Sequence, residues 1–98
     1  MIDLQSIKTQ LEPLFVKHGI VRVIVFGSYA KGTAAENSDI DMVIDSAGFL
    51  RGINFFTAQA EIAQALPIES DIFERREIKE GSKMEAEISR TGVVIYER

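Results

Sequence analysis

The feature that most limits what this chain can fold into is a glycine and a serine placed directly after a β-branched run. Residues 21–26 read VRVIVF, and Gly27 and Ser28 follow them. A short valine- and isoleucine-rich run that ends at a glycine predicts a buried strand and then a tight turn. A second run, DIDMVID, covers residues 39–45. Together they predict a β-sheet whose first connection carries the glycine turn.

The remaining segments alternate between helical and extended patterns. Apolar residues recur at helical spacing in residues 4–18, 50–66 and 77–90, and extended patterns cover residues 68–73 and 93–96. The predicted order is helix, strand, strand, helix, strand, helix, strand. This order predicts an α/β (α+β) fold with a small mixed sheet of about four strands and helices on one side.

Three residues near the end of the first predicted helix carry specific expectations. Pro13 lies inside the pattern and predicts a kink or a split, because proline cannot donate a helical hydrogen bond. Gly19 is expected to end the helix. His18, the only histidine in the chain, is expected to interact with the helix dipole as a cation rather than to take part in catalysis.

The second predicted helix presents one apolar face and ends before Pro67. The face comprises Ile53, Phe56, Ala60 and Ala63, with Phe55, Ile62 and Leu66 beside it. Phe49, Phe55 and Phe56 are expected to pack in the core. The alternative is that they form an apolar docking patch for another protein.

Length and composition bound the kind of protein. The chain has 98 residues, enough for one domain over residues 1–98. It has no cysteine, which excludes disulfides and thiolate chemistry and is consistent with a cytoplasmic location. The N-terminal residues do not resemble a signal peptide, and no stretch approaches the ~20 apolar residues of a membrane span.

The net charge of −4 argues against direct binding of duplex nucleic acid, which needs a basic face. An acidic protein can still bind a nucleotide if metal ions neutralise the phosphates. The carboxylates of the chain are therefore candidates for metal ligands.

Asp39 and Asp41 are the first of these candidates. Alternate strand residues share a face, so the two carboxylates are expected about 7 Å apart on one face. They repel each other unless a cation lies between them, and such hard oxygens suit Mg²⁺. Asp71, in a later predicted strand, can join them if the strands are neighbours, which predicts a two-metal site for displacement at phosphorus. Glu69 points to the same face and competes with Asp71.

The glycine turn is the candidate phosphate site. Gly27 allows the backbone to approach a phosphate, and Ser28 adds a hydroxyl donor. Lys31 can hold a triphosphate as a point charge. Ser38 is expected to act as a turn or capping residue that also orients Asp39. A simpler interpretation remains open, in which Ser38 and Asp39 cap the strand and Asp41 only faces solvent.

Other motifs fail on their spacing. Gly27 and Gly32 have the separation of a P-loop, but Thr33 stands where the lysine belongs. Val43 occupies the third ligand position of an EF-hand loop. The single histidine excludes a zinc cluster and makes a Ser-His-Asp triad implausible.

The stretch GSYAKGTAAENSDIDMVI resembles the signature of the DNA polymerase β-type nucleotidyltransferase superfamily, written as Gly-Ser, a further Gly, then Asp-x-Asp. The whole chain resembles its minimal nucleotidyltransferases, short prokaryotic proteins often paired with a HEPN-domain protein. The resemblance implies a polymerase β palm-like fold. It implies that Gly27 and Ser28 hold phosphate, that Asp39 and Asp41 bind metal, and that Asp71 is the general base or a metal neighbour.

Two further positions can be compared with the family pattern. Lys31 stands where many members have arginine, so the charge is kept but bidentate phosphate contact is lost. Gly32 follows the pattern. The resemblance therefore implies an active enzyme.

The activity that the resemblance implies is Mg²⁺-dependent transfer of a nucleoside monophosphate to a hydroxyl, with two metal ions and with Mn²⁺ as the alternative ion. The expected donor is ATP, the expected acceptor is a tyrosine of a HEPN toxin, and the expected role is that of an antitoxin. Two alternatives are a non-catalytic binding antitoxin and an aminoglycoside-type nucleotidyltransferase completed by a partner subunit. Other nucleoside triphosphates, a homodimer and a hetero-oligomer all remain open.

Overall fold

The structure is a computed structural model that describes residues 3–98. The first two residues of the predicted domain, Met1 and Ile2, lie outside the described part. In chain order the elements are α1 (Leu4–Lys17), β1 (Arg22–Phe26), α2 (Ser28–Lys31), β2 (Ile40–Asp45), α3 (Ile53–Ala65), β3 (Ser70–Glu74), the 3-10 helix η1 (Arg75–Glu77), α4 (Lys83–Thr91) and β4 (Val93–Glu97).

The predicted order of helices and strands is confirmed, with two short helices added. The glycine turn opens into α2, which has only four residues. The helix predicted over 77–90 starts later, at Lys83, because Ser82 caps it by accepting a hydrogen bond from the backbone N–H of Glu85.

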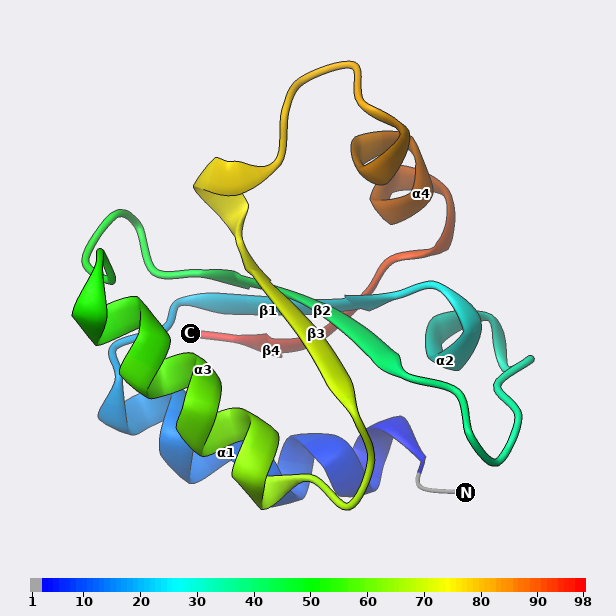
Figure 1. Cartoon of the computed structure of the whole chain (residues 1–98), viewed down its shortest axis with the longest axis horizontal. Helices are drawn as coiled ribbons and strands as arrows, with labels where there is room; N and C mark the ends of the chain where they lie inside the picture. The colour runs from blue at the N-terminus through cyan, green and yellow to red at the C-terminus, as the bar shows by residue number, and fades with distance from the viewer. Residues whose placement is uncertain (1–2) are drawn as a thin grey trace.

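The four strands form one mixed sheet in the order β3-β2-β1-β4 (Figure 1). Strand β1 is antiparallel to both β2 and β4, whereas β3 runs parallel to β2. Parallel neighbours need a long crossover, and α3 supplies it between β2 and β3. The predicted small mixed sheet is therefore confirmed.

Helices cover both faces of this sheet, so the expectation of helices on one side is wrong. Helices α1 and α3 pack on one face and form the main core, while η1 and α4 lie over the other face (Figure 1). On that second face Met84 and Ile88 of α4 pack against Phe26 and Val43. The reason is that β2 carries buried side chains on both faces, and both must be removed from water.

Helix α1 continues through Pro13, so the predicted split is absent. Ile7, Leu11 and Phe15 form a fully buried stripe on both sides of the proline, and their packing holds the two halves together. Gly19 has a φ of +68° just after the helix, as predicted. His18 Nε2 lies 2.8 Å from Glu61 Oε1 of α3, which ties the two helices together.

Helix α3 buries a different face from the predicted one. Its buried residues are Phe55, Ala58 and Ile62, whereas Ile53 is 78% exposed and Phe56 is 64% exposed. Phe49 is 78% exposed as well, so the prediction of core packing holds only for Phe55. Both stripes have helical spacing, so contact with the sheet decides between them.

We predict that Ile62→Ala lowers the free energy of unfolding by about 2–5 kcal/mol, because it leaves a cavity against the sheet. The matched change Ile53→Ala should alter it by less than about 0.5 kcal/mol, since this side chain faces solvent. Denaturation with urea measures both. A larger loss for Ile53→Ala would contradict the orientation of α3.

Candidate functional site

The parallel pairing of β2 and β3 brings two predicted carboxylates face to face. Asp41 and Asp71 are Cα partners in this register, so their side chains leave the same face of the sheet. Asp39 lies two residues upstream, just before β2 begins. Asp41 is partly buried, whereas Asp39 and Asp71 are exposed. The structure therefore places one partly buried carboxylate and two exposed ones close together, where β2 and β3 begin.

Burial is the main cause that raises the pKa of Asp41 above its ordinary value. The negative charges of Asp71, Asp39 and Glu87 raise this pKa further, in that order. A concentration of negative charge at a partly dehydrated carboxyl group favours a bound cation.

Glu69, the competitor of Asp71, lies just before β3. Its backbone carbonyl accepts a hydrogen bond from the N–H of Ile40 at 3.0 Å. It is not among the charges that raise the pKa of Asp41, whereas Asp71 is the first of them. The geometry thus favours Asp71 as the third carboxylate.

Gly27 packs against the carboxylate of Asp41. A Cβ atom at this position would lie 2.7 Å from Asp41 Oδ2, and Gly27 has a φ of +78°. Only glycine allows both the close approach and this backbone conformation. The residue therefore places the start of α2, which begins at Ser28, directly beside Asp41.

The backbone N–H of Gly27 is held by a residue that the sequence analysis missed. It donates to Thr91 Oγ1 at 2.9 Å, and the Thr91 hydroxyl in turn donates to the carbonyl of Glu87 at 2.8 Å. Thr91 is the last residue of α4. A residue near the C-terminal end of the chain therefore holds the glycine turn in place.

Glu87 is the second residue that the sequence analysis missed. Its Oε1 lies 3.9 Å from Lys31 Nζ, and it also forms an ion pair with Arg90. Glu87 and Thr91 are four residues apart and therefore share one face of α4. This spacing was the only indication in the sequence that the two residues lie on one face. It did not indicate that this face contacts the glycine turn.

Ser38 closes the turn that precedes Asp39. Its hydroxyl accepts a hydrogen bond from the N–H of Ala35 at 2.8 Å, and its own N–H donates to the carbonyl of Ala35 at 3.0 Å. Both contacts support the turn-forming role expected from the sequence.

The donor chemistry of the site fits a hard divalent cation. Within residues 3–98, no three His, Cys, Asp or Glu side chains are already gathered closely enough to hold one metal ion. Mg²⁺ does not need such a cage, because it commonly uses one or two carboxylates together with water and phosphate oxygens. The facing carboxylates of Asp41 and Asp71 meet that smaller requirement.

The raised pKa of Asp41 predicts how stability depends on pH. The folded protein binds the proton of this group more tightly than the unfolded chain does, so stability falls as pH rises above 3.8, the ordinary value. Asp41→Asn removes this loss. We expect it to raise the melting temperature at pH 7 with a metal chelator present, and the gain should shrink as the pH falls towards 3.8. A pH-independent effect in circular dichroism melts would contradict this account.

None of the described helices is both long enough and apolar enough to cross a membrane.

Comparison with known proteins gives concordant results. The family "Polymerase beta, Nucleotidyltransferase" matches residues 9–98. A candidate protein adenylyltransferase of Methanocaldococcus jannaschii is 30% identical over 71 residues, which cover 72% of this chain and 76% of that protein. The protein adenylyltransferase MntA of Thermococcus cleftensis is 27% identical over 85 residues, which cover 83% and 86% of the two chains.

The solved structures that share the fold include two toxin–antitoxin structures. One is a toxin–antitoxin complex with AMP-PNP (TM-score 0.72, 23% identity, 93% of this chain and 73% of that one). The other is a tri-AMPylated Shewanella oneidensis HEPN toxin in complex with its MNT antitoxin (TM-score 0.68, 19% identity, 97% and 73%). The fold agrees with the family match, which spans nearly all of the sequence. The chain belongs to the polymerase beta nucleotidyltransferase family.

Proposed function

We propose that this protein transfers AMP from ATP to a hydroxyl of a partner protein, as the antitoxin of a toxin–antitoxin pair. The proposed acceptor is a tyrosine of a HEPN-domain toxin. Two relatives are named as protein adenylyltransferases, and a structural neighbour is a complex with an AMPylated HEPN toxin. We place the reaction in the cytoplasm and assign it to one domain, residues 1–98.

The observation that carries this proposal is the register that sets Asp71 opposite Asp41, next to the glycine turn. A phosphoryl-transfer site needs negative groups for the metal and a turn that approaches the phosphates. Here both features lie at the same edge of the sheet.

Nucleotidyltransferases of this family generally use a divalent metal ion. We propose Mg²⁺ at Asp39, Asp41 and Asp71, with two ions bound and Mn²⁺ as the alternative. The metal would neutralise the charge that develops on the phosphate oxygens.

The residues of the chain have distinct proposed tasks. Gly27 and Ser28 hold the β- and γ-phosphates, and Lys31 adds a positive charge at the rim. Asp71 accepts the proton of the acceptor hydroxyl as the new bond to the α-phosphorus forms and the bond to pyrophosphate breaks. Ser38 supports this arrangement through the turn before Asp39.

Exposed aromatic residues favour a second candidate function. Phe49 and Phe56 are exposed and available for contact, so the protein could neutralise a toxin by binding alone. A variant without the metal ligands separates the two functions, because binding does not require them.

We expect the partner to gain one or more AMP units when the two proteins are co-expressed and given Mg-ATP. The partner tested is the product of the neighbouring gene, and intact-mass spectrometry is the measurement. The double variant Asp39→Asn, Asp41→Asn should leave the partner unmodified.

The co-expression experiment separates three outcomes. Equal modification by the wild type and the double variant would overturn the catalytic proposal. Co-purification of an unmodified partner would favour neutralisation by binding. A mass gain on an added aminoglycoside, with the partner unmodified, would favour the small-molecule reaction.

We predict that Thr91→Val slows AMP transfer by about tenfold or more, because the N–H of Gly27 loses its acceptor and the phosphate turn loosens. The KM for ATP should rise. Thr91→Ser keeps the hydroxyl and should restore the rate, which a purely steric role of Thr91 would not explain. Wild-type kinetics for Thr91→Val would show that this hydrogen bond does not support the site.

A further inference from the structure

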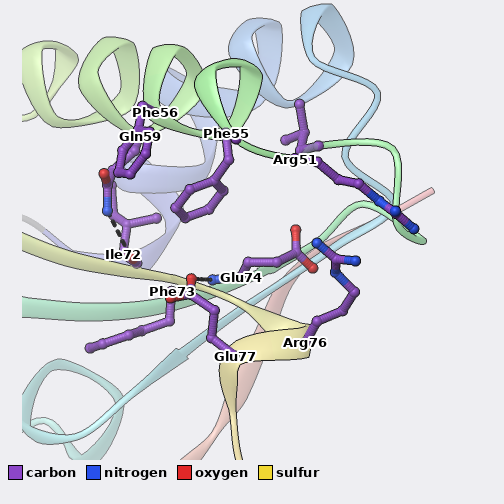
Figure 2. Close-up of a pocket in the computed structure, with 11 residues that line it drawn as sticks. Arg51, Phe55, Phe56, Gln59, Ile72, Phe73, Glu74, Arg76 and Glu77 are labelled. Atoms are coloured by element: carbon purple, nitrogen blue, oxygen red, sulfur yellow. Dashed lines mark hydrogen bonds between the residues drawn. The ribbon is translucent and has the colours of Figure 1, made fainter.

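Charged side chains other than the three aspartates gather in two places, and the first of these serves the fold. It is a pocket of about 330 Å³ between α3, β3 and η1 (Figure 2). The carboxylate of Glu74 caps η1 by accepting from the N–H of Glu77, and the N–H of Glu74 donates to Glu77 Oε1 at 2.9 Å. Ser46 Oγ also donates to Glu74, at 3.0 Å. These contacts hold η1 to β3 and to the loop that follows β2.

The second place is the face of α4 that contacts the glycine turn. Glu87 Oε1 lies 3.9 Å from Lys31 Nζ, and Arg90 forms an ion pair with the other carboxylate oxygen of Glu87. Within residues 3–98, Lys31 forms no other ion pair. Glu87 is therefore shared by the cation of the glycine turn and a cation of its own helix.

Helix α2 needs support from other elements because it is a single turn. It has four residues, and so short a helix is not stable by itself. At its start, the N–H of Gly27 donates to Thr91 Oγ1, and this hydroxyl donates to the carbonyl of Glu87. At its end, Lys31 lies beside the carboxylate of Glu87. One turn of α4 therefore supports both ends of α2, and Glu87 takes part in both contacts.

The distance between Lys31 and Glu87 leaves the ammonium group available for a second anion. Charge-assisted hydrogen bonds from nitrogen to oxygen are about 2.7–2.9 Å long, whereas this pair is 3.9 Å apart. The carboxylate attracts the ammonium group, but the N–H donors of Lys31 remain free for phosphate oxygens. A lysine side chain loses much rotamer freedom when it binds a ligand. A carboxylate that restrains it beforehand reduces that loss.

We propose that Glu87 is a positioning residue for ATP and directs Lys31 towards the β- and γ-phosphates. The inference deepens the proposed function and rests on it only for the triphosphate as the ligand of the glycine turn. Glu87 carries the same sign of charge as the phosphates, so it favours binding only through Lys31. Its removal should therefore weaken binding when Lys31 is present and should cause no loss when Lys31 is absent.

Calorimetric titration with Mg-AMP-PNP, without an acceptor, tests the proposal. Glu87→Gln keeps the carbonyl that Thr91 uses and should weaken binding about three- to fivefold, as expected for an exposed ion pair. Lys31→Met should weaken it about tenfold or more. Adding Glu87→Gln to Lys31→Met should weaken it no further. Glu12→Gln removes the same charge at an exposed position of α1 and is the matched control, which should bind as the wild type does.

The titrations use saturating Mg²⁺, because Glu87 also adds negative charge near Asp41. Equal fold losses from Glu87→Gln with and without Lys31 would show that Glu87 acts through the metal or the fold, and would overturn the proposal. Tighter binding in Glu87→Gln would show that Glu87 competes with the phosphates for Lys31, and would overturn it as well. AMP, which lacks the β- and γ-phosphates, should bind equally to the wild type and Glu87→Gln. An equal loss for AMP and AMP-PNP would contradict an action through Lys31.

The kinetics of AMP transfer supply a second readout. Glu87→Gln should raise the KM for ATP about three- to fivefold and leave kcat nearly unchanged, because Lys31 holds the phosphates before and during the reaction. A fall in kcat with an unchanged KM would overturn the positioning role.

The two assays separate this inference from the proposed function. If the wild type transfers no AMP to the partner but the loss in Glu87→Gln still depends on Lys31, the proposed function fails and the inference stands. If AMP transfer is normal and that dependence is absent, only the inference fails. Failure of the wild type to bind Mg-AMP-PNP would overturn both.

Discussion

The parallel pairing of β2 with β3 is the contact on which the candidate site depends. It sets Asp71 opposite Asp41, although the two residues are 30 positions apart in the chain. Parallel neighbours cannot be joined by a tight turn, so α3 must cross over between them. A shift of one residue in this register would turn Asp71 to the opposite face, where α1 and α3 form the core. The packing of the core and the geometry of the carboxylates are therefore specified together.

Helix α4 links the second face of the sheet to the glycine turn. Its apolar side chains cover Phe26 and Val43, and its last residue holds the N–H of Gly27. Burial, followed by the negative charges of Asp71, Asp39 and Glu87, the last of which lies on this helix, raises the pKa of Asp41. A partly buried carboxylate that lies among like charges is typical of a site that binds a cation. It destabilises the folded protein when no cation is bound. Asp41 therefore lowers the stability of the folded protein, and it is also a proposed metal ligand.

Different parts of the structure were predictable to different degrees. The strands, the order of elements and the residues of the Asp-x-Asp pair follow from patterns within a few residues of each other. The buried face of α3 does not, because Ile53 and Phe56 recur with the same period as Phe55 and Ile62. Which stripe packs depends on the sheet beneath, where Gln59 Nε2 donates to the carbonyl of Ile72 at 2.9 Å. The same limit applies to the face of α4 that carries Glu87 and Thr91.

The sequence alone determined that Gly27 and Ser28 end one strand and that Asp39 and Asp41 open the next on one shared face, because each pair belongs to a short local pattern. It also determined the kind of chemistry that such residues can support. The tertiary structure decided that Asp71 faces Asp41 and that α4 secures the glycine turn. Both are contacts between residues distant in the chain. Local spacing cannot specify such contacts, since they depend on how the hydrophobic faces of separate elements meet.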